Sequence, residues 1–312
     1  MKKRYKVFLI FLGLLFLLLF FATYELLVYP TIEIIDDKSV LGAHRGNSVD
    51  YIENTLPAFK SAANEEIYSF IEFDAQYTKD KVLVIHHDLS LKRLQQKLDK
   101  ISDLTYSELI QLSDYHIPIY EEVMEVVAGK KPLNVEIKSQ GNFEDDKQLV
   151  DFIILDLTKR GLINSTLISS ISAELIQYVN DKYNQRSNYP WYHLFWSKKR
   201  MIDTGIIYYV TEQSFTKRIP LINEITELAR DSGFFTTMIS EMYVIGANHL
   251  MIHGMNINQY KQLQTDLPFN SRVVLWTFDD KMYLILPNKH IWDWVKETNG
   301  FELPDVVPWW ED

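Results

Sequence analysis

Short apolar segments rich in β-branched residues alternate with amphipathic helical patterns over most of this 312-residue chain. This alternation constrains the fold more than any other feature, because strands that are joined by helices pair in parallel within one sheet. About eight candidate strands favour an α/β barrel of the TIM type over an open doubly wound sheet. They lie at residues 40–43, 70–73, 82–85, 133–137, 166–169, within 192–209, at 249–252 and at 272–277.

Seven amphipathic stretches lie between or after these strands, at residues 55–63, 105–112, 121–127, 148–160, 173–183, 221–231 and 258–263. One connection does not fit a regular barrel. Asp74 and Val82 are separated by too few residues for a crossover helix, which needs a dozen or so. We therefore expect an irregular (β/α)8 barrel.

A long apolar segment precedes the first candidate strand. Residues 7–28 would form a helix of roughly 33 Å at ~1.5 Å per residue, enough to cross a bilayer. A cleaved signal peptide is the alternative, but its apolar run is shorter and ends in a small-x-small site, which residues 22–24 match poorly. A transmembrane anchor at residues 7–29 is therefore expected.

Basic residues at the start of the chain give this anchor an orientation. Residues 1–6 form a basic tail that the positive-inside rule places in the cytoplasm. A linker at residues 30–39 and a barrel domain at residues 40–312 follow. The expected protein is a single-pass protein of the cell membrane with an extracytoplasmic barrel.

Composition narrows the range of partners and chemistries. The formal net charge is −10 at pH 7, and so acidic a surface repels polyanions, which disfavours nucleic acid as a partner. The chain has no cysteine, which excludes disulfides, zinc–thiolate sites and a thiol nucleophile. A small phosphodiester stays compatible, because its site needs only local positive charge or a metal ion.

Four candidate strands end in polar residues, unlike their apolar bodies. The C-terminal strand ends of a TIM-type barrel converge on one face, which carries the active site, so these segments are expected to meet. They read His44-Arg45-Gly46, Glu72-Phe73-Asp74, His86-His87-Asp88 and Glu136-Ile137-Lys138.

The residue types in these segments suit phosphate chemistry. Carboxylates at Glu72, Asp74 and Glu136 would bind a hard cation such as Ca²⁺ or Mg²⁺. Histidines can act as acid and base near neutral pH, while arginine and lysine match phosphate oxygens. Each segment alone has an ordinary explanation, such as a strand-end turn or an ion pair. Their joint occurrence at successive strand ends favours a site.

The pattern resembles the glycerophosphodiester phosphodiesterase family. The motifs HRG, ENT, ExD, HD and ExK occur in the family's order over roughly 100 residues, with weaker similarity at residues 167–176 and 273–278. The resemblance implies an irregular TIM-type barrel, a divalent cation, and cleavage of a glycerophosphodiester to glycerol 3-phosphate and an alcohol. The matching stretches are residues 41–62, 70–93, 101–112, 117–126 and 133–138.

This resemblance also implies a role for each matching residue. The expected catalytic pair is His44 and His87; His87 is preferred to His86 because the motif's histidine directly precedes an aspartate. The remaining expected roles are metal ligands at Glu72, Asp74 and Glu136, phosphate contacts at Arg45 and Lys138, and support of the first histidine or the metal by Glu53 and Asn54. Trp276 would contact the glycerol carbons or pack inside the barrel.

Departures from the family pattern mean that the sequence does not identify the substrate. Residues 64–69 lack the family's glycine, residues 94–100 replace a threonine- and glycine-rich stretch, and residues 184–218 have no counterpart. One alternative is a related phosphodiesterase acting on a lysophospholipid, a phosphoinositide or a polyglycerolphosphate wall polymer. Another is a barrel retained as a binding or structural module, which the complete set of chemical residues disfavours.

Overall fold

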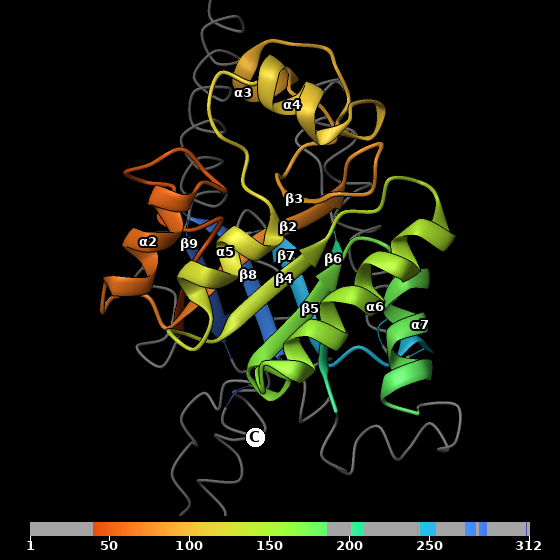
Figure 1. The fold of residues 1–312 in the computed structure, drawn as a ribbon. Coiled ribbons are helices and arrows are strands. Elements are labelled where there is room, and N and C mark those ends of the chain that lie inside the picture. The colour runs from red at the N-terminus through yellow and green to blue at the C-terminus, as the bar shows by residue number, and fades with distance from the viewer. Residues whose placement is uncertain are drawn as a thin grey trace, which may run out of the picture.

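The computed structural model describes residues 40–185, 201–208, 242, 244–253, 272–278, 281–285 and 310. Across these residues the strands form one sheet in the order β1-β9-β8-β7-β6-β5-β4-β2-β3, and β1 also pairs with β2. This second pairing closes eight of the strands into a barrel (Figure 1). The strands are β1 (Val40–Ala43), β2 (Phe70–Tyr77), β3 (Leu83–Ile85), β4 (Leu133–Ile137), β5 (Thr166–Ser170), β6 (Asp203–Tyr208), β7 (His249–His253), β8 (Arg272–Phe278) and β9 (Lys281–Ile285).

The barrel departs from eight parallel strands at one position. The pairing is parallel along β1-β2-β4-β5-β6-β7-β8, whereas β9 runs antiparallel to both β8 and β1. The expectation that the segment at 82–85 forms a barrel strand was wrong. β3 pairs antiparallel with the C-terminal end of β2 and lies outside the closed barrel. A tight turn joins β2 to β3, where Thr78 N–H donates to Val82 O at 3.0 Å.

Four helices cover the outside of the described barrel wall, and their ends follow local sequence signals (Figure 1). Asn142 caps α6 by accepting a hydrogen bond from the Asp145 N–H, so α6 begins five residues before its predicted start. Ser172 caps α7 in the same way. The helices are α2 (Leu56–Asn64), α5 (Tyr120–Val127), α6 (Phe143–Lys159) and α7 (Ala173–Tyr183).

The barrel strands β2, β4 and β5 bury both of their faces. In β2, Ile71 and Phe73 point outward and join the core beneath the helices. The inner cluster includes Phe70 at the base of β2 and Met251 of β7. Gly42 of β1 lies against the Phe70 ring, where an added Cβ would sit 2.1 Å from a ring carbon. Only glycine therefore fits this position without displacing the ring.

Residues 88–117 form a small lobe above the barrel, which we call the insertion lobe (Figure 1). It contains α3 (Lys92–Gln95), the 3-10 helix η2 (Ile101–Asp103) and α4 (Tyr106–Leu112). A capping box between Thr105 and Glu108 starts α4. Leu91, Ile101, Leu109 and Ile117 of the lobe form a core cluster with Val84 of β3.

Several sequence predictions fall on residues that the structure does not describe. They include the basic tail, the anchor and the linker at residues 1–39, the helices at 221–231 and 258–263, and most of residues 184–218. Among the helices that are described, none has the length and apolar character needed to cross a membrane.

Candidate functional site

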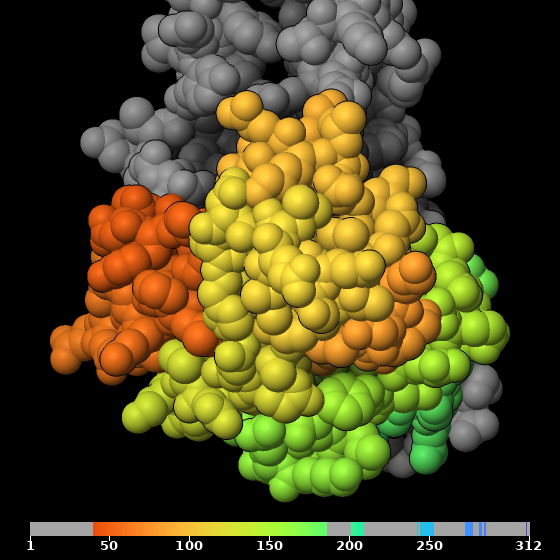
Figure 2. Space-filling view, turned by 45° about the horizontal axis from the view of Figure 1, so that its top comes forward, coloured from red at the N-terminus to blue at the C-terminus, as the bar shows by residue number. Residues whose placement is uncertain are grey.

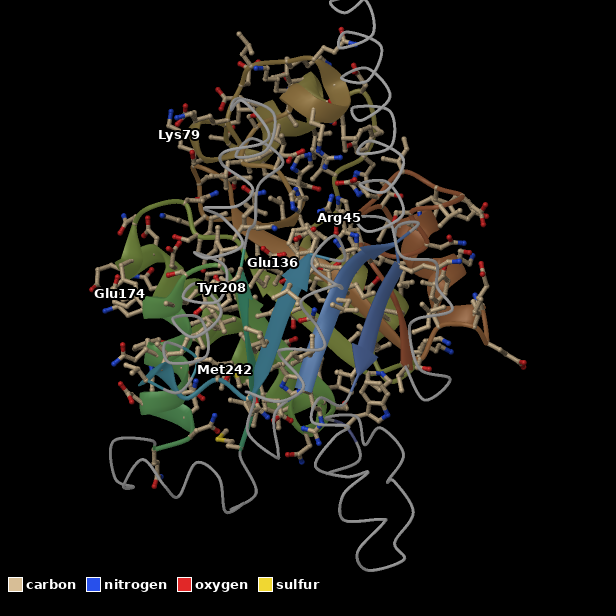
Figure 3. The ribbon with its side chains drawn as sticks, turned by 180° about the vertical axis from the view of Figure 1, so that it is seen from behind. Arg45, Lys79, Glu136, Glu174, Tyr208 and Met242 are labelled. Carbon is tan, nitrogen blue, oxygen red and sulfur yellow. The ribbon has the colours of Figure 1, made fainter. Side chains whose placement is uncertain are left out.

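The four polar strand ends meet at one cavity of about 210 Å³ on the C-terminal face of the barrel. Figure 3 shows Arg45 and Glu136 near each other at the upper ends of the strands. The residues predicted from sequence that line this cavity are His44, Arg45, Glu72, His87, Glu136, Lys138 and Trp276. Asp74 is fully buried among them and contacts Arg45 and Lys138.

A tight turn after β1 places His44 and Arg45. Arg45 has a left-handed φ of 58°, and its backbone N–H donates to Oε2 of Glu72 at 2.7 Å. Gly46 follows with a φ of +79°, and an added Cβ would lie 2.8 Å from the backbone carbonyl carbon of Ala58. A non-glycine residue in left-handed backbone costs energy and is often found at functional sites. The turn therefore fixes Arg45 against β2.

Glu72, Asp74 and Glu136 form the acidic triad predicted from sequence. Each offers a carboxylate oxygen within 4.8 Å of the others. Glu72 and Asp74 are two apart on β2, and Asp74 is in register with Glu136 of β4, so all three point into the barrel. These positions bring three carboxylates together in a buried pocket.

The protonation of the triad shows how crowded its charges are. Burial, aided by the charges of Asp74 and Glu136, raises the pKa of Glu72 well above its usual value. Burial also raises the pKa of Glu136 to about 7, although Lys138 opposes this. Oε1 of Glu72 is buried and accepts no hydrogen bond. An unsatisfied carboxylate oxygen among crowded carboxylates fits a divalent cation, so the triad could hold one.

Two positive side chains lie against the triad. Lys138 Nζ is 2.9 Å from Oδ1 of Asp74 and donates a hydrogen bond to Glu136. Arg45 Nε lies 3.5 Å from Oδ2 of Asp74. Burial alone would raise the pKa of Asp74, but Lys138, His87 and Arg45 lower it well below its usual range. Asp74 is therefore the carboxylate of the triad that stays ionised most readily.

Both predicted catalytic histidines line the cavity. The ring of His44 lies 6.4 Å from that of Trp276, centroid to centroid. Nδ1 of His87 is 3.0 Å from Oδ1 of Asp88. Burial lowers the pKa of both histidines, so each is mainly neutral near pH 7. Neutral imidazoles can accept a proton, which is the first requirement for a general base.

His86 occupies a different environment from its neighbour His87. It is not among the residues that line the cavity, and its Nδ1 lies 2.9 Å from the backbone oxygen of Asp88. The placement agrees with the choice of His87 made from sequence, while the catalytic role itself stays a prediction.

Glu53 and Asn54 support two different site residues. Asn54 donates from Nδ2 to Oδ2 of Asp74 at 2.7 Å, and its φ of 57° is left-handed. Glu53 instead accepts a hydrogen bond from Nη1 of Arg45 at 2.9 Å. Asn54 thus holds a predicted metal ligand, and Glu53 holds a predicted phosphate contact.

Sequence reasoning missed several residues of this pocket. Gln76 donates from Nε2 to the backbone oxygens of His86 at 2.6 Å and Asp88 at 2.9 Å, and so holds the segment that carries His87. Asn134 lines the cavity, and its Oδ1 accepts from Ser169 Oγ at 2.8 Å. Period-two alternation would have found both, because Gln76 follows Asp74 and Asn134 precedes Glu136 on the inward face.

The fold and the pocket together define a TIM-type barrel with a buried acidic pocket at the C-terminal ends of its strands. Comparison with known families agrees with this class. The Glycerophosphoryl diester phosphodiesterase family model matches residues 44–298, which is most of the chain. The chain therefore belongs to the glycerophosphoryl diester phosphodiesterase family.

Individual relatives match shorter parts of the chain. A Glycerophosphodiester phosphodiesterase of Bacillus altitudinis is 36% identical over 109 residues, which are 31% of this chain and 44% of that protein. Lysophospholipase D GDPD1 of Rattus norvegicus is 32% identical over 116 residues, 32% of this chain and 36% of that protein. These matches thus span less than half the length of either relative.

A solved structure supports the fold. The crystal structure of a glycerophosphodiester phosphodiesterase from Thermotoga maritima superposes with a TM-score of 0.50 at 23% identity, covering 77% of this chain and 86% of that chain. At this identity the likeness shows the TIM-type barrel alone.

Proposed function

We propose that this protein hydrolyses glycerophosphodiesters to glycerol 3-phosphate and an alcohol. One observation carries the proposal: two histidines, three carboxylates and two cationic side chains line or adjoin a single cavity. Membership of the family supports it. A divalent cation, Ca²⁺ or Mg²⁺, held by Glu72, Asp74 and Glu136 would compensate charge on the phosphate when bound.

The other side chains divide the remaining tasks. Arg45 and Lys138 bind the non-bridging phosphate oxygens, since a guanidinium and an ammonium match them. One of His44 and His87 takes the proton of the attacking hydroxyl, which belongs to water or to the substrate's own glycerol. The second protonates the leaving alcohol. Attack by the glycerol hydroxyl would give a cyclic phosphate, which water then opens to glycerol 3-phosphate. Trp276 lines the cavity beside His44 and would pack against the glycerol carbons.

An assay of the full chain tests this proposal. Glycerophosphocholine, glycerophosphoglycerol and a chromogenic phosphodiester are each incubated with Ca²⁺, Mg²⁺ or a chelator. Release of glycerol 3-phosphate that depends on a cation is expected. Turnover of no glycerophosphodiester with either cation would reject the activity, and full turnover after exhaustive chelation would reject the cation.

A lysophospholipid is a second candidate substrate. Leu89 and Ile171 line the cavity and are 46% and 51% exposed, so they offer an apolar surface at its edge. One relative carries the name lysophospholipase D. Hydrolysis rates for lysophosphatidylcholine and glycerophosphocholine, measured in parallel, discriminate the two substrates. A preference for the acylated substrate that disappears in a Leu89→Ser/Ile171→Ser variant would favour the lipid.

We also propose that residues 7–29 anchor the protein in the cell membrane with the barrel outside the cytoplasm. The length of the apolar run and the basic residues before it support this orientation. Protease treatment of intact cells tests it. Digestion of the barrel in intact cells is expected, and protection until the membrane is broken would reject the proposed orientation.

A further inference from the structure

Arg93 of α3 joins two segments that approach the cavity from different parts of the chain. Its Nη1 donates to Oε2 of Glu53 at 2.9 Å, and its Nη2 contacts Oε1 of the same carboxylate. Its Nε donates to Oδ2 of Asp88 at 2.7 Å. The guanidinium therefore holds one carboxylate from the loop after β1 and one from the segment after β3.

Each of these carboxylates also holds a residue of the pocket. Glu53 accepts from Nη1 of Arg45 at 2.9 Å through Oε1, the oxygen that Nη2 of Arg93 also contacts. Asp88 lies 3.0 Å from Nδ1 of His87 through the oxygen that Arg93 does not contact. Both Arg45 and His87 line the cavity, whereas Arg93 does not. The hydrogen bonds thus run from Arg93 through one carboxylate to each of two pocket residues.

We propose that Arg93 is a positioning residue that fixes His87 through Asp88 and Arg45 through Glu53. Asp88 and Glu53 are each anchored from outside, so neither can rotate away from its pocket partner. An Nδ1–H of His87 that donates to Asp88 leaves Nε2 as the free ring nitrogen. One guanidinium on the insertion lobe therefore determines the tautomer of an imidazole and the direction of a phosphate-binding arginine.

The geometry distinguishes Arg93 from an ordinary surface ion pair. Exposed pairs contribute little, because water and salt screen them and the side chains lose entropy. Arg93 is 45% exposed, but the carboxylates it holds are only 15% and 23% exposed. It uses three nitrogens of a rigid planar fork, which lysine cannot reproduce. In Figure 2 the insertion lobe, in orange and yellow, lies beside the red segment that follows β1, and the contact between Arg93 and Glu53 joins the two.

Kinetics of full-length variants test the proposal, and this readout rests on the proposed phosphodiesterase function. Arg93→Ala is expected to lower kcat/KM for glycerophosphocholine by about 10- to 100-fold, a range typical of lost supporting hydrogen bonds. Both constants should change. kcat should fall because His87 loses its fixed position, and KM should rise because Arg45 loses its fixed position. Arg93→Lys should be intermediate, and millimolar guanidinium should partly restore Arg93→Ala, because the site of Arg93 is open to solvent.

Lys92→Ala is the matched control, since it removes the same charge from the same short helix at an exposed position. It should retain kcat/KM within about twofold, as surface substitutions usually do. If Arg93→Ala and Lys92→Ala behave alike, the positioning role is wrong. A large loss in Arg93→Ala that guanidinium leaves unchanged, together with a lowered melting temperature, would assign Arg93 to stability alone.

A second readout does not depend on turnover. NMR of protein with ¹⁵N-labelled histidine, assigned with a His87→Gln variant, reports which ring nitrogen of His87 carries the proton. The Nδ1–H form should dominate in the parent protein and in Lys92→Ala, and should lose its dominance in Arg93→Ala. An unchanged tautomer in Arg93→Ala would overturn the inference even if the enzyme is active. The expected change in an inactive protein would support the inference while the proposed function fails.

Discussion

His87 and His86 are adjacent in the chain, but only His87 lines the cavity. Replacement of His87 by alanine is expected to lower kcat by about 10²- to 10⁴-fold, which is the usual contribution of a general acid or base. His44→Ala should cause a loss of the same order. Steady-state hydrolysis of glycerophosphocholine with Mg²⁺ or Ca²⁺ measures both losses.

The matched control for this prediction is His86→Ala. His86 is buried at 3% exposure, so its removal costs stability, but kcat should stay within a few-fold of the parent. Normal turnover by His44→Ala or His87→Ala would remove that histidine from the acid–base scheme.

Glu136 offers a direct test of the cation site. Glu136→Gln preserves the shape of the side chain and removes its charge, so affinity for Mg²⁺ or Ca²⁺ should fall at least about tenfold, or about 1.4 kcal/mol. Isothermal titration measures the affinity. Glu144→Gln, at an exposed position in the first turn of α6, is the control and should bind as the parent does. Equal affinities in both variants would place the cation elsewhere.

Sequence reasoning could find the site residues whose chemistry is unusual for a strand. Glu72 and Asp74 stood out because carboxylates alternate there with buried Ile71 and Phe73. Gln76 and Asn134 did not stand out, because neutral amides occur in many structural settings. The contacts of Glu53 could not be predicted at all. Its partner Arg93 lies 40 positions away, and the two meet only because the insertion lobe folds toward the loop after β1.

At the scale of elements, the contact between β1 and β2 depends on the missing side chain of Gly42. A methyl group at Gly42 would overlap the Phe70 ring, which is fully buried and has little room to move. Gly42→Ala should therefore destabilise the protein by about 1–3 kcal/mol, as overpacking does. Chemical denaturation of the variant measures this loss.

The double variant Gly42→Ala/Phe70→Leu provides the control, because the smaller side chain of leucine leaves space for the methyl group. The two substitutions should be less destabilising together than the sum of their separate effects. Additive losses of stability would show that the cost of Gly42→Ala does not come from overlap of the methyl group with the Phe70 ring.

Strand positions were predicted well where helices separate the strands, and poorly where they do not. Segments 40–43 and 133–137 coincide with β1 and β4. β9 was not predicted because the alternation of strands and helices reveals only strands joined by helices, and only two residues lie between Phe278 and Lys281. Two residues suffice for a hairpin, which joins antiparallel strands. The same reasoning took the segment at β3 for part of the barrel wall.

For the whole molecule, the buried carboxylates couple stability to pH. A carboxyl group whose pKa is raised on folding holds its proton more tightly in the folded state, so its contribution to stability falls as pH rises through that pKa. The pKa of Glu136 rises to about 7. The metal-free protein should therefore lose stability relative to Glu136→Gln as pH rises from about 5 to about 8, measured as melting temperature.

The buried histidines have the opposite effect. Burial lowers the pKa of His44, His86 and His87, so their neutral forms favour folding increasingly as pH rises through 6.5. Glu136→Gln keeps these histidines and lacks the ionisable carboxyl group, so the difference in stability between parent and variant isolates Glu136. Saturating cation should oppose the loss by about 2.7 kcal/mol at 100 times Kd. A difference between the two proteins that stays constant with pH would contradict the prediction.

The pairing of β9 with β1 has a consequence for biosynthesis. It joins the first described strand of the barrel to the last, whereas β8 and β9 are neighbours in the chain. A ribosome makes β1 long before β9, so a nascent barrel retains unpaired strand edges until β9 has been synthesised. Such edges can pair with strands of other chains and so lead to aggregation. Ring closure is thus expected to be a late event, and the period before it is when this protein most needs chaperone protection.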